Sequence, residues 1–251
     1  MIPQNVEHIF PQYSIDLEAC FLSPYSDVKR LVSTGVGFLV DPIDRCLALE
    51  WWIGDRRATG REIIDDWHAI KDRALKMSES DLQRWTATMQ APLTSIRLRP
   101  DYVEQKTIQK LRANFAYIET HLIHGLSDAP ADAILGCMSL AWAAGAGFNL
   151  TNPPRTEFVA AFNAGDWLSA GAHARLRETG NRGVIERNKR QDLCFQNAAT
   201  VAARGLDPAA LWWPNACPKE DTLNTLAVKA VALGIAHDSV LAGPPDDDEN
   251  P

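Results

Sequence analysis

The chain has 251 residues, 46% of them hydrophobic and 23% charged, which is enough for one good core or for two lobes that share a cleft. The formal net charge of -7 argues against a general nucleic-acid binder, because phosphate contacts need an excess of Lys and Arg. No stretch has the roughly 18 unbroken apolar residues of a membrane span. The start, Met1 to Asn5, lacks the basic and apolar regions of a secretory signal, so we expect synthesis in the cytoplasm without an export signal.

The cysteines and histidines show no metal-binding pattern. The six histidines form neither an HExxH motif nor a cluster, so we predict no metal site and no cofactor. The cysteines are odd in number and form no CxxC pair, which predicts free thiols in a reducing compartment. There are five of them: Cys20, Cys46, Cys137, Cys194 and Cys217.

The N-terminal part combines a helix with a strand-rich stretch. Apolar spacing predicts a short amphipathic helix from about Pro3 to Leu17, broken or bent near Pro11, which delivers Glu18 at its end. From Phe21 to Leu39, apolar residues are interspersed with Ser, Asp and Gly, as is typical of short strands and tight turns. We predict strands in this stretch alone, and a helix-like segment at 42–52.

The rest of the chain has helical spacing and clear boundary signals. Thr59 and Glu62 form a capping box, which predicts a helix start there. The helix should bury these residues: Ile63, Ile64, Trp67, Ile70 and Leu75. Further helices are predicted at about 101–123, 131–144, 155–163, 167–177 and 182–204, with a short one around 211–213 and another at 221–241. The stretch Asp132 to Phe148 is almost entirely small or apolar, so we expect a central helix buried on all sides.

These elements predict an α+β protein that is mostly helical. A small sheet-bearing lobe should occupy about 15–58 and a larger helical lobe about 59–197. We expect a helical C-terminal extension at 198–242, packed on the body. A disordered acidic tail should follow at 243–251, where four acidic residues come after Gly-Pro-Pro.

Two carboxylates in the N-terminal part fit the needs of glycoside hydrolysis, which places one on each side of the bond. Asp27 follows Glu18 by nine positions, and Ser33 follows Asp27 by six. If the chain doubles back, both carboxylates border one cleft. The apolar sequence neighbours of Glu18 should favour its protonated form, whereas Asp27, beside Ser26 and Lys29, should stay ionised. Taken alone, such a pair is most often two solvated carboxylates.

The spacing of these residues resembles a known family, the phage-type lysozymes and endolysins of glycoside hydrolase family 24. In that family, a Glu is followed after eight intervening residues by Asp or Cys, and after five more by Thr. A Gly, a hydrophobic residue and a second Gly come next. The corresponding residues here are Glu18, Asp27, Ser33 and Gly35-Val36-Gly37. The stretch 158–167 is similar to a helix junction of the family, and 187–195 to its final helix. The matches span about residues 15–197.

The resemblance implies a two-lobed lysozyme-like fold, with the catalytic Glu at the lobe junction and a long connecting helix starting near Thr59. It also implies an inverting muramidase, which hydrolyses the bond between N-acetylmuramic acid and N-acetylglucosamine in peptidoglycan. Carried over, Glu18 is the general acid, Asp27 holds or activates the attacking water, and Ser33 offers that water a hydroxyl. Three further residues would lie on the substrate side: Tyr25, Gly37 and Arg187, with Arg187 facing Glu18.

The sequence departs from the family pattern at several positions. Ser33 replaces the usual Thr and loses the methyl group that limits hydroxyl rotation. Phe38 stands where the family often has His, and Glu186 where it has Asn. The interval between the sheet and Thr59 is shorter than in typical relatives, which puts substrate contacts of the first lobe in doubt.

These departures leave alternatives open. One is another enzyme of the lysozyme superfamily, such as a chitosanase or a lytic transglycosylase. The other is a non-catalytic binding protein that keeps the scaffold, in line with the acidic balance of the chain. For a muramidase, the expected partners are peptidoglycan glycan strands and a delivery apparatus or inhibitor protein. Lacking an export signal, it would reach the periplasm or cell wall through a phage lysis system, phage tail or secretion apparatus.

Overall fold

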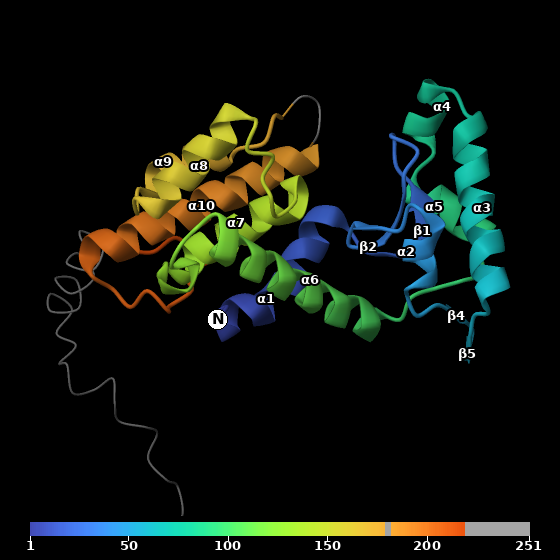
Figure 1. The fold of residues 1–251 in the computed structure, drawn as a ribbon, viewed down its shortest axis with the longest axis horizontal. Helices are drawn as coiled ribbons and strands as arrows, with labels where there is room; N and C mark the ends of the chain where they lie inside the picture. The colour runs from blue at the N-terminus through green and yellow to red at the C-terminus, as the bar shows by residue number, and fades with distance from the viewer. Residues whose placement is uncertain (179–181, 219–251) are drawn as a thin grey trace, which may run out of the picture.

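The computed structural model describes residues 1–178 and 182–218 (Figure 1). The protein is α+β and mostly helical, as predicted: a small antiparallel sheet region lies at one end of the molecule and a larger helical body at the other. No helix within these two ranges is long and apolar enough to cross a membrane.

The N-terminal helix leads directly into the sheet. α1 (Gln4–Glu18) continues through Pro11 as one helix, so the predicted break is absent. The strands β1 (Phe21–Ser26), β2 (Val32–Gly35) and β3 (Phe38–Leu39) then pair antiparallel in that order. The predicted turn at Gly35-Val36-Gly37 joins β2 to β3.

Two further short strands correct the prediction that 21–39 contains all strands. β4 (Trp52–Ile53) and β5 (Arg56–Arg57) pair antiparallel across the two-residue loop between them. Gly54 has a φ of 57° in that loop, a conformation that tight hairpins need and that glycine adopts readily. Of the helix-like stretch expected at 42–52, only α2 (Ile43–Leu47) is helical.

The predicted capping box is present at the start of α3 (Gly60–Lys76). The Thr59 hydroxyl accepts the backbone N–H of Glu62, and the Glu62 carboxylate accepts that of Thr59 at 2.8 Å. Most of the predicted inward face is buried or half-buried, but Leu75 is 57% exposed, and Ala74 is buried instead. The prediction for Leu75 was therefore wrong.

α3 belongs to the sheet region and does not connect the two parts of the molecule. It packs against α2, β1 and β2, and its Trp67 indole donates to the Val40 carbonyl at 2.9 Å. The chain then continues through α4 (Glu79–Arg84), α5 (Ala87–Gln90) and a 3-10 turn (Ala91–Leu93).

The connection is made by α6 (Pro100–His121), which runs from the sheet region to the helical body and contacts α1 and α7 (Figure 1). The expectation of a connecting helix near Thr59 was therefore wrong. The sheet-bearing part accordingly extends to about residue 99 instead of 58. α3 stays within the sheet region because its apolar face is buried against the sheet.

The core of the helical body is α7 (Ala131–Ala144), in which every residue from Ala131 to Trp142 is buried, as predicted. The expectation of a buried helix as far as Phe148 was wrong, because the helix ends at Ala144 and Ala143, Gly145 and Gly147 are exposed. α7 contacts α1, α6, α9 (Trp167–Ala174) and α10 (Arg182–Arg204), and α8 (Pro153–Asn163) packs on α9. Phe195 packs so closely on Gly136 and Gly171 that a Cβ at either position would come within 3.0 Å of its ring or Cβ.

The chain after α10 packs on the body without forming the predicted helix at 211–213. Asp132, fully buried at the start of α7, accepts the backbone N–H groups of Trp212 (2.9 Å) and Trp213 (3.0 Å). The Trp213 ring lies 4.9 Å from the Tyr13 ring. The predicted helix at 221–241 and the predicted tail at 243–251 lie outside the described residues. All five cysteines are free, as predicted.

Candidate functional site

The candidate site begins with an ion pair between Glu18 and Arg187. Glu18 is the last residue of α1, and its side chain is 33% exposed. Ala19 then leaves the helix with a φ of 58°, a strained conformation for a residue other than glycine. Arg187 reaches across from α10 and donates from Nη2 to Glu18 Oε1. The resemblance implied this pairing.

Arg187 is held from behind by a short polar chain. It is 4% exposed, and its Nη1 donates to the Ser139 carbonyl oxygen at 3.0 Å and to the Ser139 Oγ at 3.1 Å. The Tyr13 hydroxyl donates to the same Oγ at 3.1 Å. α1, α7 and α10 thus fix the guanidinium in one orientation. The prediction that Glu18 has apolar surroundings was wrong, because the fold brings the charged Arg187 side chain to it from a distant helix.

The sheet contributes Tyr25, Asp27 and Ser33. Tyr25 and Ser33 are cross-strand partners in the β1–β2 register, so their side chains share a face of the sheet. Asp27 comes two positions after Tyr25, just beyond the end of β1 and at the start of the hairpin turn. Burial raises the pKa of Tyr25 to about 12, and the negative charges of Glu18 and Asp27 add to this shift. Both carboxylates therefore act on one phenol.

Asp27 has a structural role that the sequence did not reveal. Its Oδ1 accepts the backbone N–H groups of Lys29 and Leu31, both at 2.8 Å, and its backbone N–H donates to the Leu31 carbonyl at 2.9 Å. These bonds close the β1–β2 hairpin in an Asx-type turn. Oδ2 makes no hydrogen bond to the described residues, so this oxygen can still bind water.

Ser33 and its neighbour differ in how their hydroxyls are used. Ser33 is 8% exposed, and its hydroxyl has no hydrogen-bond partner in 1–178 or 182–218. The Thr34 hydroxyl lies 3.2 Å from the carbonyl oxygens of Phe21 and Ser23 and thus ties β2 to β1. Ser33 thus offers an uncommitted hydroxyl on the face that Tyr25 occupies.

The turn after β2 leaves space at Gly37. This glycine has a φ of 82°, and a Cβ built there would meet no atom within 4 Å. Phe38, which stands where the resembling family often has His, packs tightly over Gly35 and lies 6.1 Å from the Trp142 ring. An apolar contact between the sheet and α7 thus occupies this position.

Lys110 on α6 is a site residue that sequence reasoning missed. Its Nζ lies 4.1 Å from the centroid of the Trp142 ring. Partial burial lowers the pKa of Lys110, and the charge of Glu18 acts in the opposite direction. The signal in the sequence is helical spacing, because Lys110 follows the buried residues Val103 and Thr107 by seven and three positions.

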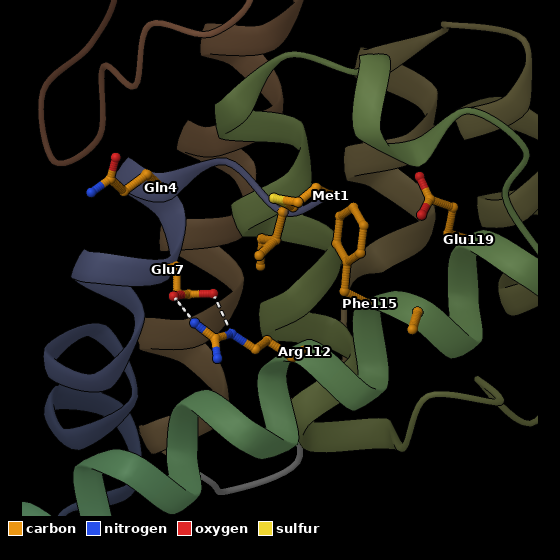
Figure 2. Close-up of a pocket in the computed structure, with 8 residues that line it drawn as sticks. Met1, Gln4, Glu7, Arg112, Phe115 and Glu119 are labelled. Atoms are coloured by element: carbon orange, nitrogen blue, oxygen red, sulfur yellow. Dashed lines mark hydrogen bonds and ion pairs between the residues drawn. The ribbon is translucent and has the colours of Figure 1, made fainter.

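A separate cavity lies near the start of the chain (Figure 2). It has a volume of about 700 Å³, and Glu7 and Arg112 form a bidentate ion pair at its wall, with bonds of 2.5 and 2.7 Å. Met1 and Phe115 contribute apolar surface. Glu7 precedes Glu18 by eleven positions on α1, about 16 Å along the helix axis, so this cavity is distinct from the candidate site.

No family model, curated protein or solved structure matched the chain in the comparisons. The resemblance to phage-type lysozymes therefore rests on the residues quoted above. The described residues contain no group of three or more His, Cys, Asp or Glu side chains that could hold a metal ion.

Proposed function

We propose that this chain is a peptidoglycan muramidase, which hydrolyses the β-1,4 bond between N-acetylmuramic acid and N-acetylglucosamine. The observation that carries the proposal is the ion pair between Glu18 and Arg187, two residues that belong to separate motifs of the resemblance and lie 169 positions apart. Further support comes from Tyr25, on whose phenol both candidate carboxylates act.

In this proposal Glu18 is the general acid. It gives a proton to the oxygen of the leaving sugar. The carboxylate that remains is negatively charged, and Arg187 already lies in contact with it. Because Arg187 is fixed by Ser139, it stabilises the product charge without reorganising.

Asp27 and Ser33 would bind and activate the attacking water. The free Oδ2 of Asp27 accepts a proton from the attacking water, and the Ser33 hydroxyl, on the face of the sheet that Tyr25 occupies, offers a second contact. Attack by this water from the side opposite Glu18 inverts the configuration at the anomeric carbon. This is the outcome expected when a water lies between the two carboxylates.

The turn bonds of Asp27 favour an alternative, a binding protein that keeps the lysozyme scaffold. Two backbone N–H groups already give Asp27 a structural reason to be present, independent of any reaction. A lytic transglycosylase is also consistent with a structural Asp27, because that reaction needs only the acid.

Mass spectrometry of the products from purified peptidoglycan distinguishes these functions. Hydrolysis leaves reducing muramic acid ends and incorporates one oxygen from ¹⁸O-labelled water, which supports the muramidase. Anhydromuramic ends without label indicate a transglycosylase. Binding to peptidoglycan without any product indicates a binding protein, and either of these two results contradicts the proposal.

A further inference from the structure

Lys110 carries a positive charge that no described acidic side chain neutralises by an ion pair. Its Nζ lies over the Trp142 ring at 4.1 Å and is 6.0 Å from the Phe38 ring. Aromatic faces attract an ammonium group but accept none of its three N–H donors as a carboxylate would. The group has therefore lost part of its water without gaining an anionic partner.

The position of this charge relates it to the proposed reaction. Lys110 lies over Trp142, and Arg187, the partner of Glu18, donates to Ser139, three positions earlier on the same helix α7. Residues three apart are neighbours on a helix, so α7 brings the two cations to one site. The charge of Glu18 also acts on Lys110. Glu18 nevertheless pairs with Arg187 and forms no ion pair with Lys110. A second cation beside the proposed acid is therefore available to a ligand.

We propose that Lys110 binds a carboxylate substituent of the glycan and thereby selects acid-bearing strands over neutral ones. This inference rests on the proposed function, since it names the substrate class of the same site. In peptidoglycan, carboxylates occur on the stem peptides, and on the lactyl group of muramic acid where no stem peptide is attached, whereas N-acetylglucosamine polymers have none. A charge-assisted hydrogen bond to such a group would satisfy the ammonium, and the Trp142 ring would exclude water from one side of it.

A binding measurement tests this without requiring cleavage. The Glu18→Gln chain is titrated by calorimetry with two probes: chitotetraose, which is neutral, and an alternating N-acetylglucosamine and N-acetylmuramic acid tetrasaccharide with free lactyl carboxylates. Lys110→Met is then added to this chain, and Lys110→Arg serves as the conservative variant. Lys106→Met is the matched control, because Lys106 lies on the same helix and contacts the Tyr102 ring.

We expect Lys110→Met to weaken binding of the acidic tetrasaccharide by about 10- to 100-fold, the range for a hydrogen bond to a charged group. Chitotetraose binding should change by less than about threefold, Lys110→Arg should restore most of the loss, and Lys106→Met should have no effect. Equal losses for both probes, no loss for either, or no binding of the acidic probe by the parent chain would overturn the proposal.

The source of the carboxylate is read from a third probe, the acidic tetrasaccharide with its lactyl groups amide-linked to stem peptides. A Lys110 effect that persists shows that a stem-peptide carboxylate can take the place of the lactyl one, and an effect that disappears restricts recognition to the free lactyl group. The muramidase proposal has a separate test: it would be contradicted if the wild-type chain released no cleavage products, whatever the binding measurements show.

Discussion

Arg187 joins two helices by donating to Ser139 on α7 with one terminal nitrogen and to Glu18 on α1 with the other. The guanidinium is buried, and it reaches both acceptors only because its two terminal nitrogens diverge. The ion pair and the hydrogen bonds to Ser139 therefore form one unit, in which the loss of Arg187 leaves several groups without partners.

Replacement of Arg187 should test this unit. Arg187→Ala is expected to lower the free energy of unfolding by about 3 kcal/mol, because removing one partner of a buried ion pair leaves polar groups unpaired. Arg187→Lys should recover part of the stability but not the cleavage of peptidoglycan, since one ammonium cannot reproduce the two-sided geometry. Urea unfolding measures the first effect, and exposed Lys189→Ala is the control. A loss below 1 kcal/mol for Arg187→Ala would show that the pair is not structurally important.

Two variants of Asp27 should separate its turn role from its proposed chemical role. Asn keeps a side-chain oxygen that can accept the N–H groups of Lys29 and Leu31 but carries no charge. Asp27→Asn should therefore retain wild-type stability within about 0.5 kcal/mol and lose peptidoglycan cleavage. Asp27→Ala should lose cleavage and also about 1 kcal/mol of stability. Full activity in the Asn variant would restrict Asp27 to the turn.

Tyr25 should make the protein sensitive to alkaline pH. Its pKa is raised from the ordinary value of 10.0 to about 12, so the folded chain holds the phenolic proton more tightly than the unfolded chain. Stability from this group is complete below pH 10 and falls as the pH rises through 12. Burial raises the pKa of Tyr13 as well. Tyr25→Phe should flatten the loss between these pH values, measured by thermal unfolding alongside tyrosinate absorbance. An unchanged pH profile in this variant would contradict the assignment.

Asp132 should anchor the segment that follows α10. It accepts the N–H groups of Trp212 and Trp213 and the side-chain amide of Asn197 at 3.0 Å, and it is fully buried. Asp132→Ala is expected to cost about 3 kcal/mol of stability, because it leaves these donors without an acceptor. Limited proteolysis should then cut between residues 205 and 218. Exposed Asp128→Ala should leave both properties unchanged, and a protease-resistant Asp132→Ala chain would contradict the anchoring role.

The sequence predicted those features that depend on local pattern. The bounds of α7 follow from a stretch that is almost entirely small or apolar, and the start of α3 follows from Thr59 and Glu62. The strands β4 and β5 were missed because two residues are too few to show alternation.

Features that depend on how elements pack could be predicted less well. α3 and α6 both have amphipathic spacing, and which of them spans the molecule is decided by the surfaces that cover them. Arg187 was expected opposite Glu18 only through the resemblance, since no local pattern links residues so far apart. Ser139 and Lys110 were missed, because each joins the site through contacts made only after folding.

The most direct test of the proposed function compares wild type, Glu18→Gln and Glu104→Gln for release of reducing sugar from purified peptidoglycan. Glu104 is exposed on α6 and provides the same chemical change away from the site. We predict reducing ends from wild type and Glu104→Gln, and a loss of at least about 100-fold in Glu18→Gln, the lower range for a general acid. Equal release by all three chains, or none from wild type, would contradict Glu18 as the acid of a muramidase.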